Sequence, residues 1–268
     1  MIRPWEGYIK PFRIFGNLYF VGSRPASSHL IDTGEGLILI DSGYPQTLYL
    51  VLEGIREVGF RPKDIQYILH SHGHYDHIGG TRALAELTGA KTIIGAADAD
   101  MCTGRLDLTW ARELGYEFVE TFEPDILLSD QDVIRLGNTE IYCIASPGHT
   151  PGTMSFFFNV TDGQKIVRAG MHGGVGVKSL SRSFLERYQL AFDCRRQYLD
   201  SIERLKKEEV DLFLGNHVWD NDTEGKSLRL RSGEENPFIL HDRTEWHLFL
   251  ERCKQRLLDM IASESHIR

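Results

Sequence analysis

Three imidazoles and one carboxylate fall within six consecutive residues of this chain, in the run His72-Gly73-His74-Tyr75-Asp76-His77. Histidine seldom fills a core, and a buried carboxylate without a partner costs roughly several kcal/mol or is neutralised. Zn2+ accepts both imidazole nitrogen and carboxylate oxygen. The simplest interpretation is therefore a divalent metal site, with Gly79 and Gly80 allowing the chain to turn tightly behind it. A solvated, charged loop is the alternative.

Two further histidines follow predicted strands. His149 lies between two Pro-Gly pairs after an apolar strand, and His217 follows the apolar run 211–214. Polar side chains at the carboxyl ends of strands are typical of sites in open sheets. Asn216 and Asp220 are rival ligands to His217. With the cluster, these histidines make six candidate ligands, enough for two metal ions: His72, His74, Asp76, His77, His149 and His217.

The spacing of these ligands predicts hydrolysis without a protein nucleophile. Two metals about 4 Å apart hold a hydroxide between them, polarise the electrophile and steady the leaving atom. The chain also has no G-x-S-x-G elbow of a serine hydrolase. We therefore expect two zinc ions as cofactors and a small-molecule substrate.

The elements around these residues read as two β-rich halves with helices. Short apolar runs and turn glycines predict strands from Phe12 to Ile40, and the strand Ile65–Leu69 leads directly into the histidine cluster. The second half has a hairpin, two further strands and an amphipathic helix predicted from Ser183 to about Lys207. This order predicts two sheets stacked inside helical layers, in a single domain over 1–268.

Composition narrows the possible partners. The formal charge of −8 disfavours binding to nucleic acid or to an anionic membrane surface. The N-terminal segment has no signal-peptide pattern and no window of about 18 apolar residues occurs, so we expect a cytoplasmic protein that does not span a membrane, with a processed secreted form as the alternative. The four cysteines form no C-x-x-C pair, which argues against a cysteine zinc site. Oligomeric state is not predicted.

These motifs, in this order, resemble the metallo-β-lactamase superfamily. The resemblance rests on H-x-H-x-D-H followed by two glycines, on Pro147-Gly148-His149-Thr150-Pro151-Gly152, on His217 at a strand end, and on Asp41 upstream. The segments Pro11–Gly22 and Thr88-Gly89-Ala90 are similar to the B3 subclass of metallo-β-lactamases. The family implies an α+β fold, an αββα sandwich, with a two-metal site at one edge of the paired sheets.

The resemblance also assigns roles to single residues. It implies that His72, His74 and His149 bind the first zinc, whereas Asp76, His77 and His217 bind the second. Asp76 is the expected catalytic residue, because a carboxylate beside the metal-bound hydroxide can accept and pass on its proton. Asp41 is expected to orient the metal loop through hydrogen bonds from behind the ligands, and an ordinary helix cap is the alternative.

Four residues are candidates for the substrate cleft. Tyr75 and Trp219 flank expected ligands, although aromatic residues in such positions often only pack. Met171 lies where B3 enzymes carry a serine. His172 lies near the position of a metal-bridging Asp in other members, so it is a candidate for contact with metal or substrate, and a satisfied or exposed histidine is the alternative. The missing bridging Asp argues against a glyoxalase II or RNase Z.

The leading functional expectation is a B3-like metallo-β-lactamase relative, whose zinc-bound hydroxide attacks the carbonyl of a β-lactam amide. The alternative within the superfamily is an intracellular lactone, ester or thioester hydrolase without β-lactam activity. A di-iron redox protein of the same fold is disfavoured by His74, where that branch carries Glu, and by the chain length. A metal-binding protein without turnover is a further, non-enzymatic alternative.

Overall fold

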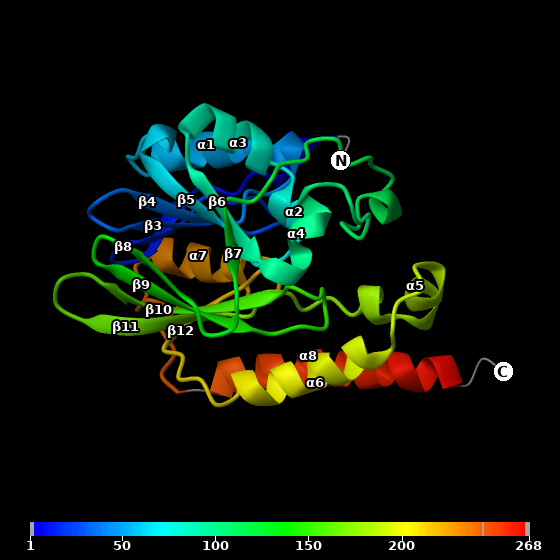
Figure 1. Cartoon of the computed structure of the whole chain (residues 1–268). Helices are drawn as coiled ribbons and strands as arrows, with labels where there is room; N and C mark the ends of the chain where they lie inside the picture. The colour runs from blue at the N-terminus through cyan, green and yellow to red at the C-terminus, as the bar shows by residue number, and fades with distance from the viewer. Residues whose placement is uncertain (1–2, 243, 266–268) are drawn as a thin grey trace.

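Two β-sheets pack face to face, with helices on both outer faces (Figure 1). The computed structural model describes residues 3–242 and 244–265, so the first two residues of the segment considered for a signal peptide lie outside the described ranges. This arrangement confirms the predicted α+β fold and its αββα sandwich. Within the described ranges, no helix is both long and apolar enough to span a membrane.

The first sheet contains seven strands in sequence order. The β1–β4 part is antiparallel, whereas β4 to β7 run parallel. All four residues of β4 are buried, as expected of a strand covered on both faces. The strands are β1 (Phe12–Phe15), β2 (Leu18–Phe20), β3 (His29–Asp32), β4 (Leu37–Ile40), β5 (Ile65–Leu69), β6 (Lys91–Gly95) and β7 (Ile126–Leu128).

The second sheet has five strands in the order β12-β11-β10-β9-β8. Since β10 is antiparallel to both β9 and β11, and β11 is parallel to β12, the carboxyl ends of β9, β11 and β12 lie at the same edge. The strands are β8 (Val133–Leu136), β9 (Thr139–Ala145), β10 (Met154–Thr161), β11 (Ile166–Met171) and β12 (Leu212–Leu214).

The helices form the outer layers, with α1 and α3 over the first sheet and α6 and α8 along the second (Figure 1). Short helices α2, α4 and α5 gather at one end of the sandwich. The α-helices are α1 (Leu48–Glu57), α2 (Tyr75–Ile78), α3 (Thr81–Thr88), α4 (Ala99–Cys102), α5 (Arg182–Arg187), α6 (Asp193–Leu205), α7 (Thr223–Arg231) and α8 (Thr244–Ser265). Single 3-10 turns are η1 (Pro4–Gly7), η2 (Pro45–Thr47), η3 (Pro62–Asp64), η4 (Ala96–Asp98), η5 (Arg112–Leu114) and η6 (Lys178–Leu180).

Strand β10 connects two layers of the core. Phe156 and Phe158 point into the core between the sheets, whereas Phe157 points to the layer under α6 and α8, because neighbouring strand residues face opposite sides. Trp246 of α8 is fully buried against Phe157, and its indole nitrogen donates to the carbonyl of Leu205 at 3.2 Å. The sandwich is therefore held by an apolar layer between the sheets and another beneath the helices.

The single helix predicted from Ser183 to Lys207 is wrong, because the chain leaves the helical path between α5 and α6. Gln189 has a φ of 53°, in the left-handed region that ends helices. The turn places the side chain of Leu190 against the apolar cluster that contains Met101 and Leu108. The break thus coincides with the packing of a half-buried leucine against this cluster. Helix α7 and strand β7 were not predicted, since α7 has no apolar stripe at helical spacing.

We expect Trp246→Ala to lower the free energy of unfolding by about 3–5 kcal/mol, because it empties a fully buried site and removes the hydrogen bond to Leu205. Trp5→Ala is the matched control, since Trp5 is 60% exposed and its loss should change stability by less than about 0.5 kcal/mol. Urea unfolding of chelator-treated protein measures both. Equal effects of the two substitutions would contradict the assigned core.

Candidate metal centre

Strand ends from both sheets supply the residues of the candidate metal centre. In the first sheet, Asp41 follows β4, the His72 to His77 run follows β5, and Asp98 follows β6. In the second sheet, His149 follows β9 and His217 follows β12. Hydrogen bonds across the sandwich join the two edges, as described below. The arrangement agrees with the general placement of sites at the carboxyl ends of strands.

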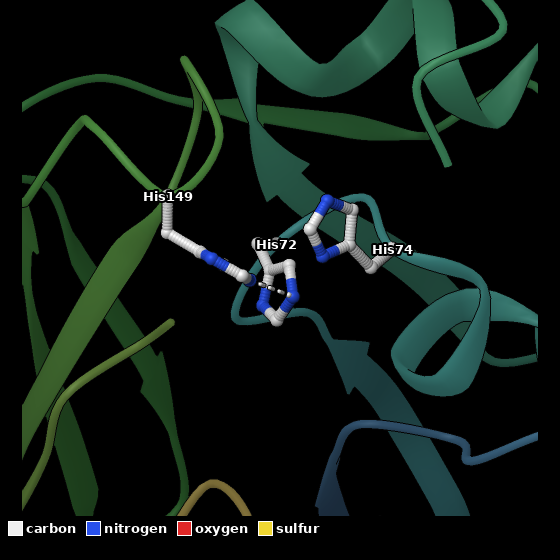
Figure 2. A group of neighbouring side chains, drawn as sticks. All are labelled: His72, His74 and His149. Atoms are coloured by element: carbon white, nitrogen blue, oxygen red, sulfur yellow. Dashed lines mark hydrogen bonds between the residues drawn. The ribbon is translucent and has the colours of Figure 1, made fainter. Parts of the chain in front are cut away.

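His72, His74 and His149 come together in one group (Figure 2). One nitrogen from each ring lies within 4.8 Å of the others. The Nε2 atoms of His72 and His149 are 3.1 Å apart, and the centroids of the His74 and His149 rings are 4.4 Å apart. Three imidazole nitrogens facing one small volume are suited to a divalent metal such as zinc.

Backbone carbonyls determine which nitrogen of each ring is free. His72 Nδ1 lies 2.7 Å from the carbonyl oxygen of Gly173, and His149 Nδ1 lies 2.6 Å from that of Gly176. A carbonyl only accepts hydrogen bonds, so both Nδ1 atoms carry the proton and donate it. Both Nε2 atoms are thereby left with lone pairs that point toward one another, which is the tautomer a metal ligand requires.

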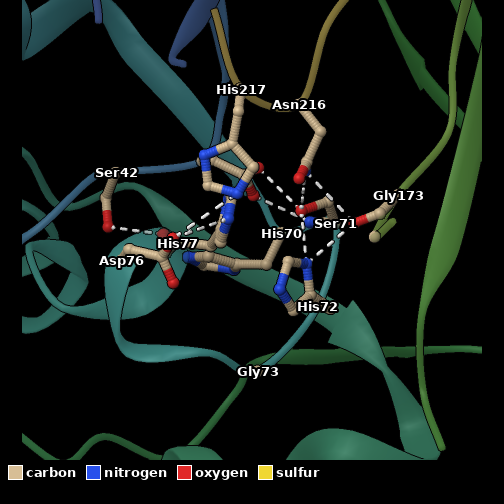
Figure 3. Close-up of polar contacts among 12 residues, drawn as sticks. Ser42, His70, Ser71, His72, Gly73, Asp76, His77, Gly173, Asn216 and His217 are labelled. Atoms are coloured by element: carbon tan, nitrogen blue, oxygen red, sulfur yellow. Dashed lines mark hydrogen bonds and ion pairs between the residues drawn. The ribbon is translucent and has the colours of Figure 1, made fainter. Parts of the chain in front are cut away.

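A second group, made of His72, Asp76 and His77, adjoins the first, and His217 lies next to Asp76 (Figure 3). Asp76 Oδ2 is 3.3 Å from His77 Nε2 and 3.7 Å from His217 Nε2. His72 is shared, because one of its nitrogens falls within 4.8 Å of ligand atoms of Asp76 and His77. His217 donates from Nδ1 to the carbonyl of Pro25 at 2.9 Å, so its Nε2 is also free. The six predicted ligands therefore lie in two adjoining groups.

Asp41 lies behind the second group and connects it to the cluster loop. Its carboxylate accepts hydrogen bonds from the Ser71 amide at 2.8 Å, the Ser71 hydroxyl at 2.7 Å and His77 Nδ1 at 2.8 Å. The residue has a φ of 60°, a left-handed conformation that Asp adopts more readily than most residues. Its carboxylate contacts the cluster loop, so the contacts match the role expected of Asp41 rather than that of a helix cap.

Burial and neighbouring charges separate the pKa values of these groups. Burial, with repulsion from His77 and His149, lowers the pKa of His72 well below its ordinary value, and burial lowers that of His149 to about 4. Burial opposes protonation of His77 as well, but the carboxylates of Asp76 and Asp41 outweigh it and raise the pKa of His77 to about 10. For Asp76, His77 and His217 outweigh the effect of burial and lower the pKa.

Asp98 was not predicted, although it connects the two ligand-bearing loops of the first group. Its buried carboxylate accepts from the Gly73 amide at 2.8 Å, the Thr150 hydroxyl at 2.6 Å and the Gly152 amide at 2.7 Å. Gly73 lies between His72 and His74, and Thr150 follows His149. Burial raises the pKa of Asp98, and these three hydrogen bonds offset part of that rise. Its position after β6, like that of Asp41 after β4, is the signal that could have identified it.

The rival ligands to His217 point elsewhere. The amide nitrogen of Asn216 donates to the Ser71 hydroxyl at 3.1 Å and to the Gly173 carbonyl at 3.2 Å, which joins the two sheets behind the ligands (Figure 3). Asp220 is buried and accepts from the His217 amide at 2.9 Å. Both residues therefore hold the loop that carries His217.

Three of the four residues expected in the substrate cleft are buried, and their place in the cleft stays a prediction. Tyr75 is 4% exposed and packs against aromatic rings, with its hydroxyl accepting from Gln46 at 3.2 Å. Met171 lies in the core between the sheets, and His172 faces the opposite side, against Phe249 beneath the helices. Met171 is the last residue of β11, and His172, just after the strand, accepts from the Gly174 amide at 3.1 Å through Nδ1.

Two tryptophans lie against the ligands. Trp219 is 60% exposed, and its ring stacks on His217 with centroids 4.4 Å apart and planes 7° apart, so its predicted place in the cleft stays a prediction. Trp110, which was not predicted, lies with its ring 6.0 Å from that of His74. Both rings form apolar walls beside the candidate metal centre.

Comparison with known proteins identifies the family. The family model described as "Metallo-beta-lactamase superfamily" matches residues 21–162, more than half of the 268 residues. The chain belongs to the metallo-beta-lactamase superfamily. It is thus one of that superfamily's hydrolases, with a His-rich candidate metal site.

Individual relatives refine this placement. The structure is similar to that of BJP-1, a subclass B3 metallo-beta-lactamase of Bradyrhizobium japonicum, with a TM-score of 0.88, 26% identity and 98% of each chain covered. This similarity confirms the predicted resemblance to the B3 subclass. An N-acyl homoserine lactonase of Bacillus thuringiensis is 24% identical over 72% of this chain and 82% of its own length. A hydroxyacylglutathione hydrolase of Anaeromyxobacter dehalogenans is 31% identical over 59% of this chain, which spans only 54% of that relative.

We expect Asp98→Asn to weaken zinc binding by about 10–100-fold, the usual effect of removing a partner that orients ligands. Asn has one side-chain oxygen in place of two, so it cannot accept all the hydrogen bonds that Asp98 accepts. The loops of His74 and His149 therefore lose part of their common anchor. Asp100→Asn is the matched control, because Asp100 is exposed and pairs with Arg105 on the surface. Titration against a competing zinc chelator measures both affinities, and unchanged affinity in Asp98→Asn would contradict the role.

Proposed function

We propose that the chain is a dinuclear zinc hydrolase that attacks a carbonyl carbon. The observation that carries the proposal is the pair of Nε2 atoms of His72 and His149, 3.1 Å apart and both left with lone pairs by the carbonyls behind them. Two facing lone pairs repel unless a cation lies among them. The donor set of imidazole nitrogens and one carboxylate suits zinc.

Each group of ligands would hold one ion. His72, His74 and His149 would bind the first, and Asp76, His77 and His217 would bind the second. When bound, two such ions lower the pKa of a water molecule toward 7 and polarise the substrate carbonyl. Asp41 would keep His77 oriented, with Nε2 toward the second ion, through its 2.8 Å hydrogen bond to Nδ1. Asp76 would accept the proton of the attacking water and pass it to the leaving group.

A β-lactam amide is the leading substrate class, and the similarity to a subclass B3 metallo-beta-lactamase supports it. A lactone, ester or thioester is the second candidate. It is supported by the relatives named N-acyl homoserine lactonase and hydroxyacylglutathione hydrolase, and by Met171, a buried thioether where B3 enzymes carry a serine. Both classes present a carbonyl that a hydroxide can attack.

The proposal predicts that His149→Ala lowers kcat/KM by more than about 100-fold on any substrate that is turned over, since losing outer partners alone costs about 10–100-fold. His241→Ala is the control, because His241 is exposed and outside both ligand groups. The assay uses zinc-loaded protein with a cephalosporin, a carbapenem, lactones and thioesters, each with and without chelator. Full activity in His149→Ala, or activity that survives chelation, would contradict the proposal.

A further inference from the structure

An apolar pocket adjoins the candidate metal centre, and we propose that it binds a linear aliphatic chain on the acyl side of the substrate. The inference rests on the proposed function and names its substrate class as acyl compounds with an uncharged alkyl chain. The cavity has a volume of about 270 Å³, and His74 and His149 are part of its lining. A chain held there therefore keeps its polar end beside two of the predicted metal ligands.

Four aliphatic side chains of the pocket lining come from three separate segments, alongside Phe184 and a few polar residues. Met101 belongs to α4 and Leu108 to the loop after it, Leu185 belongs to α5, and Leu190 lies in the turn between α5 and α6. Each methylene transferred from water to such surroundings gains about 0.8 kcal/mol. The volume lies just below the range of about 300–1,000 Å³ that is usual for small-molecule sites. A short chain fits this space better than a large ring system.

The charges around the pocket also favour an uncharged group. Among the described residues that line it there is no Lys or Arg, and the one carboxylate, Asp193, belongs to an exposed residue at the start of α6. An anionic group pushed into the pocket would lose its hydration without gaining a cationic partner. The charged or polar part of the substrate therefore stays at the metal centre or in solvent.

Contacts around Trp110 connect this pocket to the metal ligands. The Trp110 ring packs on Phe184 of α5 with centroids 4.9 Å apart, and its centroid lies 6.0 Å from that of His74. The Ser181 hydroxyl caps α5 by accepting from the Phe184 amide at 3.3 Å. Trp110 has a φ of 66°, a left-handed conformation that is unfavourable for a residue other than glycine. This strained residue holds one wall of the pocket against a predicted ligand.

Binding of 1-alkanols to the zinc-free protein tests the pocket without any catalytic step. Ligand-detected NMR with chains from 1-butanol to 1-decanol should show saturable binding that tightens about fourfold per methylene until the pocket is full. Cys194→Trp should abolish binding, because Cys194 lines the pocket. The matched control is Ala83→Trp on the exposed face of α3, which should bind as the unsubstituted protein does. Absent binding, or affinity that does not depend on chain length, would overturn the inference.

Turnover by the zinc-loaded enzyme supplies the second test. For thioesters of one thiol with acyl chains of increasing length, KM should fall with each methylene and then level off. Leu190→Ala, which enlarges the pocket, should move the levelling-off point to longer chains, whereas Cys194→Trp should flatten the dependence. Chain-length dependence that Cys194→Trp leaves intact would contradict the inference. Loss of hydrolysis of every substrate with intact alkanol binding would refute the proposed function and leave the pocket in place.

Discussion

The 3.1 Å approach of two histidine nitrogens is the constraint on which the rest of the site depends. His72 comes from the first sheet and His149 from the second, yet each donates its Nδ1 proton to a carbonyl of the loop after β11, that of Gly173 or Gly176. One short backbone segment therefore determines the tautomer and the direction of both rings. A cation bound among the Nε2 atoms would offset the repulsion of their lone pairs and would join the edges of the two sheets.

Buried carboxylates organise the loops that carry the ligands. Asp41 and Asp98 follow parallel strands of the same sheet, and each accepts three hydrogen bonds from segments next to ligands. Burying a carboxylate is costly unless its oxygens are satisfied, so these bonds are made only when the loops take one arrangement. The ligand loops thus owe their geometry to side chains behind them, since they have little regular secondary structure of their own.

The sequence predicted which residues gather at the candidate metal centre better than it predicted the residues around them. The H-x-H-x-D-H run and His217 could be recognised as candidate ligands, because few structural roles require such spacing after apolar strands. Asp98 lies in a run with Asp100, a pattern that looks like an ordinary exposed turn, and only the fold brings it to Thr150.

Tertiary packing explains what the local pattern did not indicate. Tyr75 and Met171 are next to functional positions along the chain, but tertiary packing turns their side chains into cores. The apolar periodicity of the sequence likewise predicted a helix that continues through Gln189. In the structure the helix breaks there, where Leu190 packs into the cluster of Met101 and Leu108. The local sequence pattern indicated the candidate ligands. Long-range packing determines which of the neighbouring residues line the site.

Anomalous diffraction at the zinc absorption edge, from crystals of the zinc-loaded protein, tests the dinuclear centre most directly. The proposal predicts two zinc peaks about 3.5–4 Å apart. One peak should lie among His72, His74 and His149, and the other should lie among Asp76, His77 and His217. A single peak at full zinc occupancy, or peaks outside these two groups of side chains, would contradict the account.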